Sequence, residues 1–292
     1  MTASFTMFDA NDTAVGIVVQ SAYGTAGTPS NILMARGLSV APGRIENVSI
    51  GTASSRSAIA ANRAKGLRLA RVTIEADVYK TAAVDALLSL IFGASTGAAN
   101  LYKFGTFSWR NTGGAGIVLQ DIGIDTATIQ LRQQSVMSIV ASGNSYADWG
   151  TSGTPSTGSP LAETPIIVDD TAITFGGTDV FFESVSISVS TPLAPIYGND
   201  IFPIGFVAPH GREVRAVVSM LPTSVNFGYL SSLASDTTGS LVISNSQISI
   251  TLRNAAIANV TLPEFDMMTN GNILVEFVAY ATDDSTTEVA IS

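Results

Sequence analysis

Regular alternation of apolar and polar residues is the clearest pattern along the chain. Residues 72–78 and residues 184–190 (SVSISVS) place an apolar side chain at every second position, and residues 272–281 (NILVEFVAYA) form a β-branched and aromatic run. A period of two predicts strands with one buried face. Residues 81–92 (TAAVDALLSLIF) are rich in alanine and leucine and predict a helix, and residues 225–234 show a weaker helical pattern. The fold class is therefore predicted to be mainly β, with a short helix in each half.

A stretch without charge or large apolar residues divides the chain near its middle. Residues 150–160 (GTSGTPSTGSP) have the composition of a flexible linker. With 292 residues, the chain has the length of about two domains. We predict a first domain over residues 1–149, the linker over 150–160, and a second domain over 161–292.

The two halves resemble each other in the order of their segments. Four low-identity matches occur in the same order at similar offsets, which predicts a tandem duplication. The matched pairs are residues 45–50 with 182–187, 72–93 with 214–235, 108–111 with 251–254, and 140–143 with 278–281.

Composition argues against an enzyme. The chain has no cysteine, and its one histidine, His210, lies between turn residues. Thiolate metal sites and cysteine nucleophiles are therefore excluded, and a Ser-His-Asp triad has little scope. The acidic pairs at 169–170 and 283–284 lack the ligand spacing of a calcium loop, so we interpret them as solvated turn acids. We expect no catalytic residue, cofactor or metal.

Charge is sparse and unevenly distributed. Charged residues make up 13% of the chain, and the net charge is −9. Residues 1–150 carry 11 basic and 9 acidic groups, whereas residues 151–292 carry 3 and 14. A surface this poor in charge is typical either of a β protein rich in serine, threonine, glycine and alanine, which needs no partner, or of subunits that are covered by other subunits, and we favour the second explanation. Unlike charges on two similar halves suggest that such halves lie next to each other.

Two groups of charged residues are candidate functional positions. Glu75 and Asp77 project from the same face of their predicted strand, so in a ring of sheets they would line a channel. Basic residues also concentrate between positions 44 and 71, a segment without aromatic residues for base stacking. We interpret that segment as a loop that docks on a neighbouring subunit, with nucleic-acid binding as the alternative. Its four candidate docking residues are Arg56, Arg63, Lys65 and Arg68.

Several segments resemble the tail tube proteins (major tail proteins) of long-tailed bacteriophages. The opening YGTAGTP at residues 23–29 looks like that family's start, and FESVSISVS at 182–190 with LAPIYG at 193–198 looks like a strand and its loop. GREVRAVV at 211–218 is similar to the family's next strand. These motifs consist of strand and turn residues, and together with the order of segments in both halves they span most of the chain.

The resemblance implies tandem tail-tube-type β-sandwich or β-barrel domains, each with a flanking helix. Such domains form rings that stack around an acidic channel for DNA ejection, and long loops dock onto the next ring; the loop candidates here are residues 51–70 and 191–211. Two domains in one chain would complete a sixfold circle with three copies. The implied partners are further copies of the chain, together with tape measure, terminator and distal tail proteins. DNA would pass through the channel without being bound specifically.

The expected location is the virion tail, after synthesis in the cytoplasm of the host bacterium. The first ten residues contain no basic group, so no export signal is expected, and no apolar run is long enough to span a membrane. The alternatives are a terminator or distal tail protein of the same fold, or a tandem β-sandwich adhesin or binding module. A hydrolase is the weakest alternative.

Overall fold

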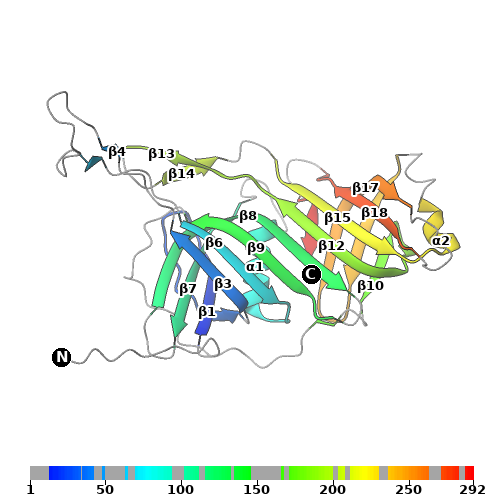
Figure 1. The fold of residues 1–292 in the computed structure, drawn as a ribbon, viewed down its shortest axis with the longest axis horizontal. Helices are drawn as coiled ribbons and strands as arrows, with labels where there is room; N and C mark the ends of the chain where they lie inside the picture. The colour runs from blue at the N-terminus through cyan, green and yellow to red at the C-terminus, as the bar shows by residue number, and fades with distance from the viewer. Residues whose placement is uncertain are drawn as a thin grey trace.

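The computed structural model shows an antiparallel β protein in which two lobes share one sheet (Figure 1). In the view of Figure 1, the first half of the chain lies on the left and the second half on the right. The residues that the structure describes are 13–33, 35–42, 48–49, 63–64, 70–93, 102–111, 116–132, 135–145, 166–167, 171–199, 203–207, 211–229, 236–262, 271–282 and 287–292.

The first half forms a sheet with the strand order β3-β6-β9-β8-β7-β1-β2. Helix α1 packs against β1, β2 and β8, and the two short strands β4 and β5 pair with each other. The elements are β1 (Thr13–Val19), β2 (Asn31–Leu33), β3 (Ala35–Pro42), β4 (Val48–Ser49), β5 (Arg63–Ala64), β6 (Ala70–Asp77), α1 (Ala82–Phe92), β7 (Gly105–Asn111), β8 (Gly116–Arg132) and β9 (Ser138–Ser145).

The second half repeats this order as β12-β15-β18-β17-β16-β10-β11, with β19 added beside β17. In each half, a two-stranded hairpin (β4–β5 or β13–β14) comes directly before a long strand (β6 or β15), and a helix (α1 or α2) follows that strand. The elements are β10 (Ala172–Phe175), β11 (Thr178–Asp179), β12 (Phe182–Ser190), β13 (Ala194–Tyr197), β14 (Pro203–Val207), β15 (Glu213–Met220), α2 (Ser224–Phe227), β16 (Thr238–Ser244), β17 (Ser249–Thr261), β18 (Ile273–Ala279) and β19 (Val289–Ile291).

The turn between strand and helix also repeats, down to its hydrogen bonds. Thr81 caps α1 by accepting a hydrogen bond at Oγ1 from the backbone N–H of Val84, at 3.3 Å. Thr223 does the same for Asn226 at 3.2 Å. A threonine hydroxyl satisfies a backbone donor that the first helical turn leaves free. The two caps are 142 residues apart, the same spacing that aligns residues 72–78 with 214–220 in sequence.

Two of the four sequence matches fall on strands that hold different places in the two sheets, and these two are wrong. Residues 45–50 overlap β4, whereas residues 182–187 belong to β12, whose place in the first half is taken by β3. Residues 108–111 lie in β7 but residues 251–254 lie in β17, which takes the place of β8. Alternating serine and valine is a general strand pattern, so short matches of this kind do not fix which strand is which.

The predicted elements appear at the expected positions. The alternating segments form β6, β12 and β18, and residues 82–92 form α1. The described part of the weaker helical segment gives the short helix α2. The predicted linker at 150–160 lies outside the described residues, so the domain division remains a prediction.

Strand β8 joins the halves. Its first part pairs with β7 and its last part, residues 126–132, pairs with β12 of the second half, while β9 runs along its other edge. Eight neighbouring strands therefore form one run, β3-β6-β9-β8-β12-β15-β18-β17. The buried apolar side chains of both lobes belong to one hydrophobic cluster, so the two halves pack as one body.

Candidate functional site

The face of the eight-strand run that points away from the core is lined mainly by small polar side chains. On β12, Val185, Ile187 and Val189 face the core and are at most 4% exposed. The alternate positions of β12 from 184 to 190 are all serine, and their register partners on β8 include Thr126 and Thr128. Successive side chains on a strand point to opposite faces. The sheet therefore has an apolar inner face and a serine- and threonine-rich outer face.

Glu75 and Asp77 both lie on this outer face, as the alternation predicts. Along β6 the core positions are buried, Glu75 is exposed and Asp77 is partly buried. Asp77 is held by Arg36, whose Nη2 lies 2.7 Å from Asp77 Oδ1. The structure therefore confirms that the two carboxylates share the face away from the core, one of them in an ion pair.

The second half places a charge cluster on the same face. Arg215 donates from Nε to Glu213 and from Nη1 to Glu276, each at 2.6 Å. Hydrogen bonds to Glu276 and Glu213 raise the pKa of the Arg215 guanidinium. These groups are exposed, so the cluster fixes side-chain positions more than it stabilises the fold.

The described part of this face carries both signs of charge. Two of its arginines, Arg36 and Arg215, are bound by carboxylates. Two further carboxylates lie beside outward side chains, because Asn144 donates to Asp125 and Asn272 donates to both Glu183 and Ser219. The carboxylates and arginines on this side of the run are Glu75, Asp77, Asp125, Glu183, Glu213 and Glu276 with Arg36, Arg71, Arg132 and Arg215. The acidic channel implied by the family resemblance stays a prediction.

Of the predicted docking residues, Arg56, Lys65 and Arg68 lie outside the described residues. The backbone of Arg63 is described, in β5 of the β4–β5 hairpin. The corresponding segment of the second half, residues 191–211, contains the β13–β14 hairpin. Figure 1 shows β13 and β14 extending from the second half across the upper side of the first.

An aromatic cluster fixes the β13–β14 hairpin to the first half. Phe206 on β14 lies 4.5 Å from Phe104, measured between ring centroids, and 6.1 Å from Tyr102. Tyr23 donates a hydrogen bond from its hydroxyl to the carbonyl oxygen of Pro203, at 3.1 Å. Edge-to-face aromatic pairs add to the energy of buried area. Within one chain, the predicted docking loop of the second half thus contacts the other half.

Burial in this cluster raises the pKa of Tyr23 to about 12, and the nearby Asp121 adds to the effect. Both disfavour tyrosinate, so the stabilisation is complete below the ordinary tyrosine pKa and is lost as pH rises from about 10 to about 12. We expect Phe206→Ala to lower the Tyr23 pKa by exposing its ring. Absorbance titration of tyrosinate near 295 nm measures this shift, with Phe181→Ala, at an exposed phenylalanine, as control. An unchanged titration in Phe206→Ala would contradict the docked hairpin.

A buried ion pair, which the sequence analysis missed, connects α1 with the second half. The Arg212 side chain is 4% exposed and its Nε lies 3.0 Å from Glu288 Oε2. Its Nη1 donates to the carbonyl oxygen of Phe92, at the end of α1. The second half has only three basic residues. That scarcity, together with the position of Arg212 directly before a strand, is the signal that could have singled it out.

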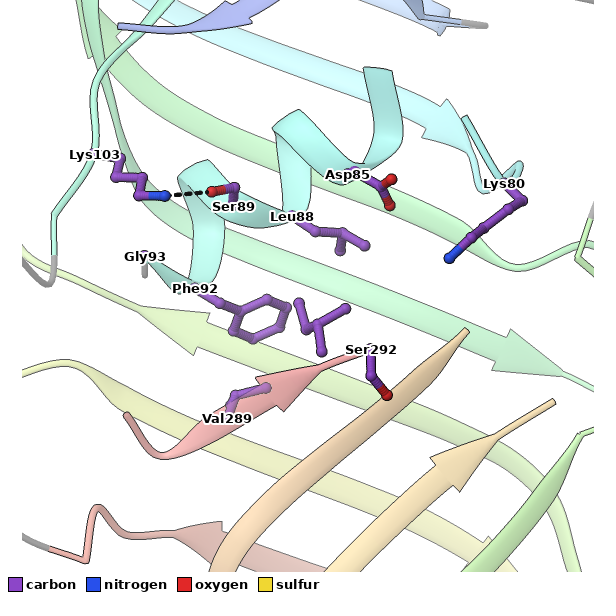
Figure 2. Close-up of a pocket in the computed structure, with 10 residues that line it drawn as sticks. Lys80, Asp85, Leu88, Ser89, Phe92, Gly93, Lys103, Val289 and Ser292 are labelled. Atoms are coloured by element: carbon purple, nitrogen blue, oxygen red, sulfur yellow. Dashed lines mark hydrogen bonds between the residues drawn. The ribbon is translucent and has the colours of Figure 1, made fainter. Parts of the chain in front are cut away.

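A cavity of about 290 Å³ lies beside this ion pair, between α1 and the C-terminal strand β19. Figure 2 shows Lys80, Asp85, Ser89 and Lys103 around it, with Lys103 Nζ 3.0 Å from Ser89 Oγ. A serine–lysine pair can act as nucleophile and base, but an acyl-transfer site also needs backbone donors for the oxyanion. Ser89 lies inside α1, where the helix uses its N–H. The backbone N–H of Ser89 is therefore not available as such a donor, and the described residues that line the cavity show no built oxyanion site.

The described residues contain no group of three or more potential metal ligands among histidine, cysteine, aspartate and glutamate. His210 and the acidic pairs at 169–170 and 283–284 lie outside the described residues. In the described parts of the chain, neither helix has the length and apolar character needed to cross a bilayer.

Comparison of the chain with protein-family models gives no match, and comparison with curated proteins gives none either. The resemblance to tail tube proteins therefore stays a prediction from sequence.

Proposed function

We propose that the chain is a structural subunit of a phage tail tube. In this proposal, copies close into rings, and the rings stack into a tube around a channel for DNA. The observation that carries the proposal is the repeated strand order of the two halves within a single continuous sheet. A chain built from two equivalent modules, joined edge to edge, can continue the same arrangement in further copies.

The repeated topology supports a tandem duplication of two tube domains. The matching helix caps, separated by 142 residues, support it independently of strand order. Three such chains would supply six equivalent modules, which gives a homotrimeric ring with pseudo-sixfold symmetry. A contact between unlike surfaces forms a ring when it closes, and ring-on-ring contacts that do not close give a tube.

The outer face of the eight-strand run suits the wall of a channel for DNA. Serine and threonine cover much of it, and Arg36 and Arg215 are held by carboxylates instead of facing phosphate. Binding to DNA gains its strength from cations that replace counterions on phosphates. A wall on which carboxylates outnumber arginines among the described residues would bind DNA weakly and let it slide. In this proposal Glu75 and Asp77 line the channel.

The proposal assigns the chain no catalysis and no cofactor. Its partners are further copies of itself and the tape measure, terminator and distal tail proteins of a virion. Trp109, one of two tryptophans, is partly buried and packs against the core. This burial disfavours its use as an exposed sugar-binding platform in an adhesin.

Negative-stain electron microscopy of the purified chain over a concentration series tests this function. We expect hollow rings at low concentration and stacked tubes at high concentration. Rings that never stack would instead indicate a terminator or distal tail protein. Single particles at every concentration, also after addition of tail-assembly partners, would contradict the proposal and favour a two-domain binding module.

A further inference from the structure

The pairing of β8 with β12 is a junction between two equivalent modules. Residues 126–132 of β8 lie antiparallel to residues 184–190 of β12, with Ile129 opposite Ile187. Ile129 and Ile187 are fully buried, and Leu131 is 1% exposed. The covering strand comes from the other half, so this junction buries side chains that neither half could bury alone.

The counterparts of these two strands have an open edge each. In the second half, β17 takes the place of β8. Its neighbour β16 pairs with β17 only as far as Ala256. On the other edge of β17, the pairing with β18 continues to Thr261. In the first half, β3 takes the place of β12 and pairs only with β6. Among the described residues, no strand covers the outer edge of β3 or residues 257–261 of β17.

Sequence and backbone show which residues of β8 and β17 correspond. Residues 128–131 read TIQL and residues 259–262 read NVTL. The register of the pairing agrees with this alignment, because Thr128 pairs with Val140 and Asn259 pairs with Glu276. Val140 and Glu276 pair in turn with Glu75 and Val217, which are equivalent positions of β6 and β15. Leu262 therefore corresponds to Leu131, and Val260 to Ile129.

The burial of these residues differs as expected for a missing neighbour. Leu262 is 47% exposed, against 1% for Leu131. On β3, Leu38 and Val40 are only partly buried, whereas their counterparts on β12, Ile187 and Val189, are at most 4% exposed. Both open edges thus carry half-covered apolar side chains at positions that the internal junction buries.

We propose that β3 of one copy pairs antiparallel with residues 257–262 of β17 in a second copy, and so repeats the β8–β12 junction between chains. This interface rests on the proposed ring assembly and identifies the surfaces that close it. The register of the internal junction places Ser39 opposite Asn259 and Gly37 opposite Thr261. Their counterparts are the observed pairs Ser188–Thr128 and Ser186–Gln130.

Closure of the ring explains how the chain avoids open-ended sheet growth through these two edges. An exposed strand edge is a template for aggregation unless it is covered. Here the two open edges belong to opposite ends of the eight-strand run. Each copy offers one edge of each kind, so a closed ring leaves none uncovered.

Engineered disulfides test the pairing directly, because the natural chain contains no cysteine. Opposite residues on antiparallel strands lie about 4.5–5.5 Å apart at Cα, within disulfide range. We expect Ser39→Cys/Asn259→Cys and Gly37→Cys/Thr261→Cys, oxidised in the assembled protein, to give covalent multimers ending in a closed species without free thiols. All four positions are exposed, and a Cβ at Gly37 meets nothing within 4 Å.

The same four positions supply the matched controls. The exchanged pairs Ser39→Cys/Thr261→Cys and Gly37→Cys/Asn259→Cys are shifted by two residues, which separates the Cα atoms by roughly 7–8 Å, and should link at least ten-fold less. Thr128→Cys/Ser188→Cys should form an intrachain disulfide, which confirms the oxidation conditions. Equal linking of in-register and exchanged pairs would overturn the register, and dimers from Ser39→Cys alone would show that like edges pair.

The result separates this interface from the proposed function. Tubes in the microscope without any linking of the in-register pairs would overturn the β3–β17 interface and leave the tube function standing. Linked closed rings that never stack would support the interface and contradict the tube function.

Discussion

Replacement of Arg212 with alanine is expected to lower the free energy of unfolding by about 3–5 kcal/mol, because it leaves a buried carboxylate unpaired. The carboxylate of Glu288, which is only 16% exposed, would lose its ion-pair partner. The carbonyl oxygen of Phe92 would also lose the donor that it has in Arg212. Urea unfolding followed by circular dichroism measures the change.

The matched control for this prediction is Arg215→Ala. Arg215 also bonds two partners, yet its side chain is 45% exposed, so its loss should lower the free energy of unfolding far less than the loss of Arg212. The double variant Arg212→Met/Glu288→Leu removes both charges and should recover most of the loss. Equal small effects for Arg212→Ala and Arg215→Ala would show that the buried pair does not connect the halves.

Leu131→Ala is expected to destabilise the isolated chain by about 2–5 kcal/mol, because it opens a cavity in the junction between the halves. Leu262→Ala, at the corresponding open edge, should change the stability of the monomer by no more than about 0.5 kcal/mol. The two leucines differ mainly in burial, because Leu131 is 1% exposed and Leu262 is 47% exposed. Urea unfolding, at a protein concentration too low for assembly, measures the free energy of unfolding of both variants.

The same pair should behave differently once the chain assembles. If β3 of a second copy covers Leu262, Leu262→Ala should raise the concentration needed for ring formation several-fold, although the monomer is unaffected. Light scattering over a dilution series gives this concentration. A Leu262→Ala variant that assembles at the same concentration as the natural chain would contradict cover at this edge.

Much of the fold could be predicted from local pattern. The alternation in residues 72–78 gave both the strand β6 and the face on which Glu75 and Asp77 lie, because side chains alternate across a strand. The alanine- and leucine-rich segment gave α1 in the same way. These elements depend on neighbours in sequence, so sequence contains the necessary information.

Features that depend on distant residues were not predictable in this way. Strand β7 lies in the glycine-rich stretch 105–116, where its pairing with β1 and β8 outweighs weak local propensity. The β8–β12 junction joins residues more than fifty positions apart, and nothing local indicates which edges meet. Net charge likewise does not predict where charges lie: the chain is acidic as a whole, but Asp77, Glu213 and Glu276 on the outer face are each bound by an arginine.

Matches within the sequence pointed to the repeated strand order of the two halves, but they did not fix its alignment. The match of residues 72–78 with 214–220 was anchored by the following helix and falls on equivalent strands, β6 and β15. The matches at 45–50 and 108–111 had no such anchor and fell on strands in different places. A strand pattern of two residue classes recurs by chance, whereas a strand followed by a capped helix recurs far less often.

The mass of a single ring tests whether two equivalent modules per chain close a pseudo-sixfold circle. Native mass spectrometry of rings, isolated below the concentration at which they stack, counts the chains directly. We expect three copies of the 30.2 kDa chain in each ring. A ring of six chains, or a chain that stays monomeric when other measurements show it folded, would contradict it.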